Sequence, residues 1–321
     1  MQTQTTTYRL RNWREYNASL VNRGSLTLWI ETDIATWWLK KDKSGKPGAS
    51  DTYSDRAVET CLALRLLLRL PLRQSEGLVR SLVQMARLSL PVPDYSTLCR
   101  RQKHLPVTLP VRPGQKARHI VLDSTGLKVF GEGEWKVRQH GAGKRRQWRK
   151  LHVSIDEATG EVLAVRVTEA ETADGVQLPE LVLQSQQVGG PVAQASADGA
   201  FDSWANAAFL SQQGITATIP PRKGSKIRQH GNCKKAPLQR DQTLRAIRRL
   251  GRRGWAKASG YSRRSLAETH MMRQKRILGS GLSSRCAVNQ ATEGRLRCLV
   301  LNRLTHLGMP DSYAVSVAKT G

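Results

Sequence analysis

The sequence has no long uninterrupted run of apolar residues. Its richest apolar stretch, CLALRLLLRL at 61–70, contains two arginines and is too short to cross a bilayer. The N-terminal MQTQTTTYRLRNW lacks the apolar core of a secretory signal peptide. Both absences argue against a membrane-spanning or exported protein, so we expect a cytoplasmic one.

Cysteine is also scarce. The five cysteines are an odd number without close pairs, which argues against a disulfide framework. No CxxC or HExxH motif occurs, and the lone HxxC pair of His230 and Cys233 is more typical of chance than of a zinc site. A GxxxxGK[ST] motif is missing too, so we expect no nucleotide cofactor.

Acidic residues are few relative to basic ones. The 321 residues include 52 Lys and Arg but only 25 Asp and Glu, a formal net charge of +27. Such a charge repels itself unless it meets a polyanion, so double-stranded DNA is the favoured partner. A basic protein of the membrane surface is the alternative, but no segment combines a long apolar face with the charge. The length allows two domains, and 39% apolar residues indicate a globular chain.

The first part of the sequence predicts helices. Leucines recur at helical spacing over 54–69, behind a capping candidate in Ser54. A second helix follows from about Arg73, and a short basic one follows a cap at Asp94 or Ser96. We interpret 1–112 as a mostly helical DNA-binding region, helix-turn-helix-like around 54–105. Its DNA contacts would be Ser96, Thr97, Arg100 and Arg101. The alternative is a plain helical bundle with a solvated arginine face.

Residues 109–118 read as a linker, after which the pattern becomes strand-like. The order that follows is three strands, helix, strand, helix, strand, and then a helix that contains Glu268. This order predicts a mixed α/β sheet of the ribonuclease-H-like fold, with an antiparallel edge. We assign 113–305 to this domain and 306–321 to a C-terminal tail.

A strongly basic segment interrupts this domain. Residues 222–257 contain thirteen Lys or Arg and one acid, Asp241. A solvated charged loop is the usual explanation for such a run, but the imbalance is too one-sided for ion pairing and favours phosphate contact. We expect an insertion that binds DNA through Arg248, Arg249, Arg252 and Arg253. The basic stretch at 40–50 predicts a second, flexible loop.

Two aspartates belong to predicted strands, Asp123 inside one and Asp198 at the end of another. Asp123 follows the apolar HIVL, where an acid must be paired, hydrogen-bonded or metal-bound. Asp198 follows VAQASA, where the strand ends. Either acid alone could equally be structural or catalytic. Asp202 is predicted to cap the next helix.

Residues 261–279 contain a single acid, Glu268, among several arginines and lysines. If 261–275 is one helix, Tyr261, Arg264, Glu268 and Lys275 fall within about 60° of arc, along one stripe. Ala267, Met271 and Leu278 lie beside it, so the stripe borders a buried face. An i,i+4 ion pair is the simpler explanation, but the order of basic before acidic is the weaker one.

This spacing of Tyr, Arg, Glu and Lys resembles the C-terminal signature of bacterial insertion-sequence transposases of the DDE type. LDSTGLKVFGEGEW around Asp123 and SADGAFDS around Asp198 are similar to the other two acid motifs of the insertion-sequence-five group. GSLTLW, YSDRAVETCLALR and LPLRQSEGL are similar to the N-terminal part of that group. The resemblance covers nearly the whole chain.

The resemblance implies that Asp123, Asp198 and Glu268 bind two Mg²⁺ ions, which Mn²⁺ can replace, for cleavage and strand transfer of DNA. Asp123 would bridge the ions. Arg264 and Lys275 would hold phosphates, and Tyr261 would stack or donate a hydrogen bond unless it only packs in the core. The partners implied are terminal inverted repeats and target DNA, with a homo-oligomer when two ends are paired, at the bacterial nucleoid.

Two other functions remain open at this point. A ribonuclease-H-like nuclease would share the three acids, but would need neither the basic insertion nor the helical N-terminal part. A catalytically inactive or domesticated DNA-binding relative would share the charge without needing all three acids.

Overall fold

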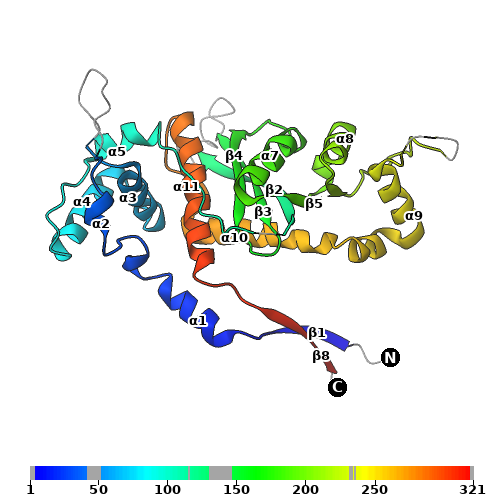
Figure 1. Ribbon diagram of the computed structural model, residues 1–321, viewed down its shortest axis with the longest axis horizontal. Helices are drawn as coiled ribbons and strands as arrows, with labels where there is room; N and C mark the ends of the chain where they lie inside the picture. Colours follow the sequence, from blue (N-terminus) through cyan, green and yellow to red (C-terminus); the bar gives the residue numbers. More distant parts are fainter. Residues whose placement is uncertain are drawn as a thin grey trace, which may run out of the picture.

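The computed structural model describes residues 4–41, 52–114, 116–129, 147–230, 234 and 236–318. Three parts follow one another in Figure 1: N-terminal helices at one end, a sheet with its covering helices in the middle, and helix α9 (Gln239–Ala258) at the other end. Most of the predicted loop at 40–50, and Cys233, fall outside the described residues. Within those ranges, every helix is too short or too polar to span a bilayer.

The central sheet has the predicted ribonuclease-H-like topology. Its strands lie in the order β4-β3-β2-β5-β6, and the short β7 also pairs with β2. The first three strands are antiparallel, whereas β5, β6 and β7 run parallel. The bounds are β2 (Arg118–Val129), β3 (Trp148–Asp156), β4 (Val162–Glu169), β5 (Val192–Ser196), β6 (Thr216–Thr218) and β7 (Gly281–Leu282).

Helices cover both faces of this sheet. Ile120 and Leu122 of β2 belong to the core cluster formed with α7 (Leu178–Gly189) and α8 (Trp204–Gln212). Val121 and Leu127 belong to the cluster formed with α10 (Ser265–Leu278) and α11 (Ala287–His306). Successive side chains of a strand alternate between its faces, so Asp123 lies on the face that α10 covers.

The open edge of the sheet is closed by one side chain of α9. The Gln239 Oε1 accepts the backbone N–H of Ala217 at 2.8 Å, and its Nε2 donates to the carbonyl of Ile215 at 3.1 Å. One amide thus makes the bonds that a further strand would make. This edge strand has only three residues, so little of it is left for pairing with another chain.

The predicted N-terminal helices are confirmed as α3 (Asp55–Leu67), α4 (Leu72–Met85) and α5 (Tyr95–Gln102). Ser54 caps α3 by accepting the N–H of Ala57, and Asp94 caps α5 by accepting the N–H of Thr97. These helices share one core with the last helix of the chain. Leu62 and Leu66 of α3 belong to the same buried cluster as Leu299 and Leu304 of α11.

Several elements were not predicted from the sequence. Helix α11 is buried nearly all round, so its sequence lacks the polar stripe by which a surface helix is recognised. It approaches β4 closely at Gly294, where a Cβ atom would meet Val167 at 2.4 Å.

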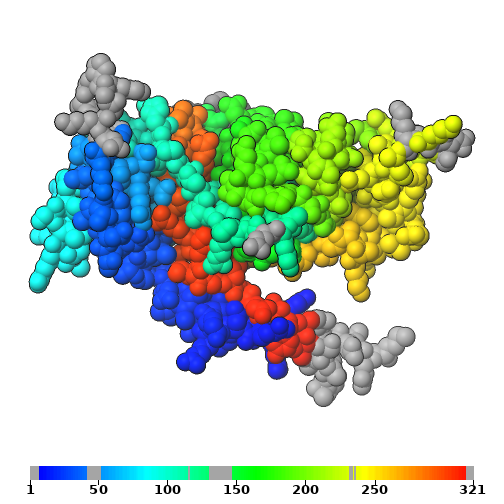
Figure 2. All heavy atoms as spheres, in the orientation of Figure 1, coloured from blue at the N-terminus to red at the C-terminus, as the bar shows by residue number. Residues whose placement is uncertain are grey.

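The stretch predicted as a C-terminal tail contains β8 (Ser312–Ala318), which pairs with β1 (Gln4–Leu10) in an antiparallel ribbon. The ribbon projects from the body of the molecule (Figures 1 and 2). It is attached through α1 (Trp13–Asn22), whose Ser19 and the nearby Arg23 donate to the carbonyl of Gly308. A short helix, α2 (Ile34–Trp37), precedes α3.

Candidate active site

Asp123 and Asp198 occupy matching places on neighbouring parallel strands. Val121 of β2 pairs with Ser196 of β5, and each acid follows two residues further along its strand direction. Asp123 accepts the backbone N–H of Ser124 at 2.9 Å, and Asp198 accepts that of Ala200 at 2.8 Å. Neighbouring strands lie about 4.8 Å apart, so this register brings the two carboxyl groups to one place.

Glu268 reaches the same place from α10. The predicted single helix over 261–275 is not what the structure contains. Tyr261–Arg264 forms a 3₁₀ turn, which is frequent at helix N-termini, and the α-helix starts only at Ser265. Gly260 precedes the turn in a left-handed conformation with φ 72°. Ala267 and Met271 of α10 are buried against the sheet as predicted, so Glu268 stands at the edge of that contact.

The predicted basic neighbour of this glutamate is in contact with it. The Arg264 guanidinium forms an ion pair with the Glu268 carboxylate, one helical turn away. Burial acts to lower the pKa of Arg264, but the nearby Tyr261, Glu268 and Asp123 outweigh it and raise that pKa. The Glu268 side chain is still 58% exposed, so its carboxylate remains accessible.

The three acids are close enough to influence one another's charge. Burial raises the pKa of Asp123, and the negative charges of Asp198 and Glu268 raise it further. The hydrogen bond from Ser124 and the positive charge of Arg264 oppose this rise. The carboxyl groups therefore form one electrostatic unit whose repulsion a cation would relieve.

This unit suits a hard divalent cation. Carboxylate oxygens are the donors that Mg²⁺ prefers. In the described part of the chain, no three acidic, histidine or cysteine side chains already stand at metal-binding distance. Mutual repulsion and the Arg264–Glu268 pair explain why the acids lie near one another without closing into a ligand cage.

Tyr261 stands beside the acids and is partly buried. Its ring packs against Trp255 of α9, with centroids 5.3 Å apart, and the Arg264 guanidinium lies 5.9 Å from its ring centroid. Burial raises the pKa of Tyr261. Trp255 was not singled out from the sequence, although it is the one aromatic residue of the basic segment. It also lines a groove of ≈ 520 Å³ between β6 and α9.

Lys275 is not part of the cluster. It is exposed near the other end of α10, seven residues from Glu268, or about 10 Å along the helix axis. The structure thus brings together five of the six predicted residues of the site and leaves the sixth on the same helix at a distance.

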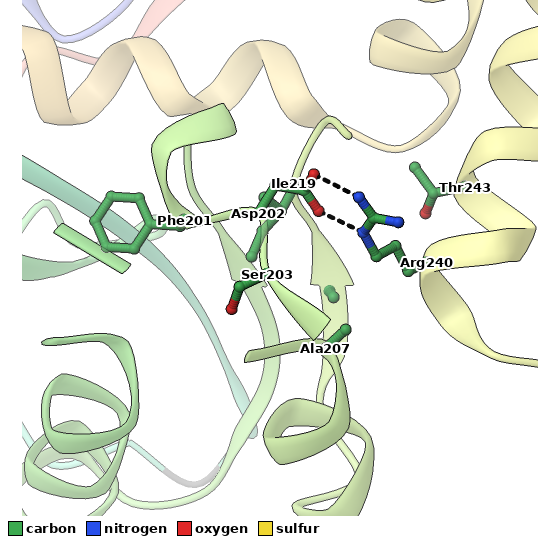
Figure 3. Close-up of a pocket in the computed structure, with 8 residues that line it drawn as sticks. Phe201, Asp202, Ser203, Ala207, Ile219, Arg240 and Thr243 are labelled. Atoms are coloured by element: carbon green, nitrogen blue, oxygen red, sulfur yellow. Dashed lines mark hydrogen bonds and ion pairs between the residues drawn. The ribbon is translucent and has the colours of Figure 1, made fainter. Parts of the chain in front are cut away.

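Asp202 was predicted to cap α8, and this is wrong. Ser203 caps that helix, by accepting the N–H of Asn206. Asp202 instead makes a bidentate ion pair with Arg240 of α9, at 2.6 and 2.8 Å (Figure 3). It also accepts the backbone N–H of Arg222. The cavity beside this pair measures only ≈ 20 Å³, which is room for about one water molecule and not for a substrate.

The basic segment is therefore fixed to the sheet. Asp241, its one acid, is fully buried and accepts the backbone N–H groups of Arg228 and Gln229. The segment is largely the helix α9, bent at Gly251 with φ 70°. The four predicted DNA-binding arginines lie on either side of this bend and are exposed: Arg248, Arg249, Arg252 and Arg253.

Helix α5 lies beyond α11 from the sheet (Figure 1), and two acids occupy its N-terminus. Glu76 accepts the N–H of Tyr95, and Asp94 accepts hydrogen bonds from both Ser96 and Thr97. The Ser96 and Thr97 bonds hold the pKa of Asp94 at about 2.

The two predicted arginines of α5 differ. Arg100 is exposed, and its guanidinium donates to the Thr97 hydroxyl. Arg101 is used within the fold, where it donates to the carbonyl of Tyr53 and pairs with Asp55 at 2.6 Å.

The raised pKa of Asp123 leads to a test of the acid cluster. When the folded-state pKa of a carboxyl group lies above its unfolded-state pKa, the protein loses stability as pH rises between these two pKa values. Asp123→Asn removes this cost, so we expect a higher melting temperature than the parent at pH 7 without metal. The difference should vanish below about pH 4, where the carboxyl is protonated in both states.

Mg²⁺ should reverse the order at pH 7. At ten times its dissociation constant, a ligand of the folded state adds about 1.4 kcal/mol, a rise of about 3 °C for a domain of this size. We expect this rise in the parent and in Glu180→Gln, a surface control on α7, but not in Asp123→Asn. Equal Mg²⁺ shifts in all three proteins would show that Asp123 does not contribute to cation binding.

Comparison with known proteins identifies the family of this chain. Residues 21–132 and 114–303 each match a model of the transposase DDE domain, and the second match covers more than half of the chain. Among solved structures, the chain is similar to the piggyBac transposase in a synaptic complex with hairpin DNA, at 11% identity and a TM-score of 0.35. That likeness covers 95% of this chain and 78% of the other. On the strength of the domain matches, this chain belongs to the family of DDE transposases.

Proposed function

We propose that this DDE transposase cuts DNA at the ends of its own insertion sequence and joins them to target DNA, using Asp123, Asp198 and Glu268. The observation that carries this proposal is the convergence of three electrostatically coupled carboxyl groups on one face of the sheet. They lie in a chain whose net charge of +27 favours a polyanionic substrate.

The three carboxylates would hold Mg²⁺ or Mn²⁺. Such ions, when bound in pairs, activate a water or 3′-hydroxyl and stabilise the leaving oxygen of a phosphodiester. Asp123 is central, on the middle strand, and feels the charges of both other acids, which fits a carboxylate shared between two ions. Asp198 and Glu268 flank it from the end of β5 and the start of α10.

Arg264 and Tyr261 would position the DNA strand. The guanidinium now paired with Glu268 is also the cation nearest to the acids in this segment, so it can take a phosphate oxygen when the carboxylate has another partner. Tyr261 backs it with a ring that Trp255 holds in place. Lys275, exposed on the same helix, would bind a phosphate further along the strand.

The rest of the DNA would be held on both sides of the acids. The four exposed arginines at the bend of α9 form one side, and Ser96, Thr97 and Arg100 of α5 the other. Asp94 and Glu76 make the N-terminus of α5 unsuitable for a phosphate, so α5 would read DNA through its exposed side chains. Arg101 would support the helix instead of touching DNA.

We assign a separate role to each region from these positions. Residues 1–112 would recognise the terminal inverted repeats, 113–305 would cut and join, and 222–257 would grip the phosphate backbone. Two copies would act together when two ends are paired. We assign the chain to the insertion-sequence-five group because its motifs around both aspartates resemble those of that group.

Substitution of the acid Glu268 and of the base Lys275 in α10 should have different effects. Glu268→Gln keeps the shape and loses the charge, so end cleavage should fall by more than about a hundredfold while DNA affinity stays equal or rises. Lys275→Ala should bind and cleave more weakly, by about 1.5–3 kcal/mol, as for a lost charged hydrogen bond. DNA binding and end cleavage of both variants are measured with labelled DNA that carries the flanks of the gene, once with Mg²⁺ and once with chelator.

Glu180→Gln, on α7 across the sheet, controls for the chemical change and should cleave like the parent. If Glu268→Gln cleaves at nearly the parent rate, Glu268 is not part of the active site, and its pair with Arg264 is only a structural contact. Cleavage by the parent in chelator would exclude the divalent-cation chemistry. Binding to these flanks without cleavage by the parent would favour an inactive relative.

The arginines of α9 should set the salt dependence of DNA binding. Each phosphate contact adds about 0.9 to the slope of log K against log salt concentration. Arg248→Gln, Arg249→Gln and Arg253→Gln together should therefore flatten that slope by about 2.7, and Arg249→Gln alone by about 0.9. Arg252 is left in place because it also donates to the carbonyl of Pro221.

Arg166→Gln is the matched control. Its side chain is 41% exposed and pairs with Glu180 on the other face of the sheet. It should leave the slope unchanged. If the triple variant keeps the slope of the parent, the arginines of α9 are solvated and lie away from DNA.

A further inference from the structure

Helix α10 is held at its C-terminus by an arginine from the N-terminal helices. The last carbonyls of a helix lack partners within the helix and attract cationic donors. The Arg69 Nη2 donates to the carbonyl of Arg276 at 2.8 Å and to that of Ile277 at 3.2 Å. More than two hundred residues of sequence separate donor and acceptors.

The backbone conformation at the end of α3 directs the Arg69 side chain toward α10. Arg69 follows α3 with φ 53°, and the N–H of Leu70 closes the helix end by bonding back to the carbonyl of Arg65. This tight ending turns the chain away and leaves the Arg69 side chain pointing to α10. Its guanidinium also lies 3.7 Å from the position that a Cβ atom would take at Gly279, where α10 ends.

A second arginine, which is buried, holds the chain just past the same end. Arg297 of α11 donates to the carbonyl of Gly279 at 2.9 Å and to that of Gly281. The two arginines differ in what their removal would do. Arg297 is 1% exposed and belongs to the core, whereas Arg69 is exposed and its loss opens no cavity.

The two ends of α10 are therefore fixed by different parts of the molecule. At the N-terminal end Glu268 stands beside the acids of the sheet, and near the C-terminal end Lys275 directly precedes the two residues that Arg69 holds. A helix is stiff, so a shift at one end moves the other. A misplacement of about 1 Å can reduce catalysis a hundredfold.

We infer that Arg69 is a positioning residue for the active site: it ties the N-terminal helices to α10 and so fixes the placement of Glu268 and Lys275. The inference rests on the proposed function, in which these two residues hold the cation and the DNA strand. Arg69 touches neither. Its contribution should appear in the rate of cleavage and in the order of α10 rather than in DNA affinity.

The chain provides a matched control. Arg87 ends α4 with the same φ of 53°, closes its helix in the same way through Leu88, and is exposed. Across the described ranges, its guanidinium has no hydrogen bond or ion pair. Glycine favours this left-handed conformation, so Arg69→Gly and Arg87→Gly should both keep the backbone conformation and lower its strain. Only the first removes a contact with α10.

The test compares the full-length parent with Arg69→Gly, Arg69→Lys and Arg87→Gly. Amide hydrogen exchange over residues 273–282, DNA affinity, and single-turnover end cleavage at saturating DNA are measured for each. We expect Arg69→Gly to exchange faster in this stretch and to cleave at least about tenfold more slowly, with unchanged affinity and melting temperature. Arg69→Lys should recover part of the rate, and Arg87→Gly should match the parent.

Cleavage by Arg69→Gly at the rate of Arg87→Gly would overturn the inference, as would parent-like exchange over 273–282. A lower melting temperature in Arg69→Gly alone, without any change in rate at saturating DNA, would make the contact structural and overturn it too. Absence of cleavage in the parent would count against the proposed function. Exchange would then decide by itself whether Arg69 orders α10.

Discussion

The burial of Asp123 beside two other carboxyl groups is the constraint on which the acid cluster depends. Asp123 is partly buried on the central strand, where its charge is unfavourable, and Asp198 and Glu268 make it more so. The fold holds the acids there because each one is fixed by a separate element: β2, the turn after β5, and the start of α10. Arg264 supplies a positive charge within the cluster and keeps Glu268 beside it. Such an arrangement is unfavourable alone and becomes favourable with a cation, which is typical of a functional site.

The elements around the cluster are tied together by arginines and amides. Arg240 of α9 binds Asp202, Gln239 closes the sheet edge, and Arg69 caps α10 from the N-terminal helices. The N-terminal helices have their apolar faces against α11, so they are not a separate body with its own core. The regions that we propose to bind DNA, at the two ends of the molecule, are therefore connected to the acid cluster through packed contacts.

Much of this was predictable from the sequence. Apolar runs bounded by turns gave the strands of the sheet, and the spacing from Tyr261 to Glu268 gave the group that the structure brings together. Local capping chemistry placed the starts of α3 and α5. What failed depended on contacts distant in sequence. Asp202 has the spacing of a cap, but Arg240 takes it because the two meet only in the folded chain. Helix α10 starts at Ser265 because the turn before it is 3₁₀, which the spacing of apolar residues does not reveal. Helix α11 is buried on all sides, so it has no stripe to detect.

The account depends on Asp123, Asp198 and Glu268 acting as one cation site. The most direct measurement is the anomalous scattering of Mn²⁺ in crystals of the protein bound to a cut DNA end, because it locates each ion independently of activity. The account predicts Mn²⁺ in contact with carboxylate oxygens of all three residues and with the terminal phosphate. Mn²⁺ that touches only one of these acids, with Glu268 still paired to Arg264, would contradict it.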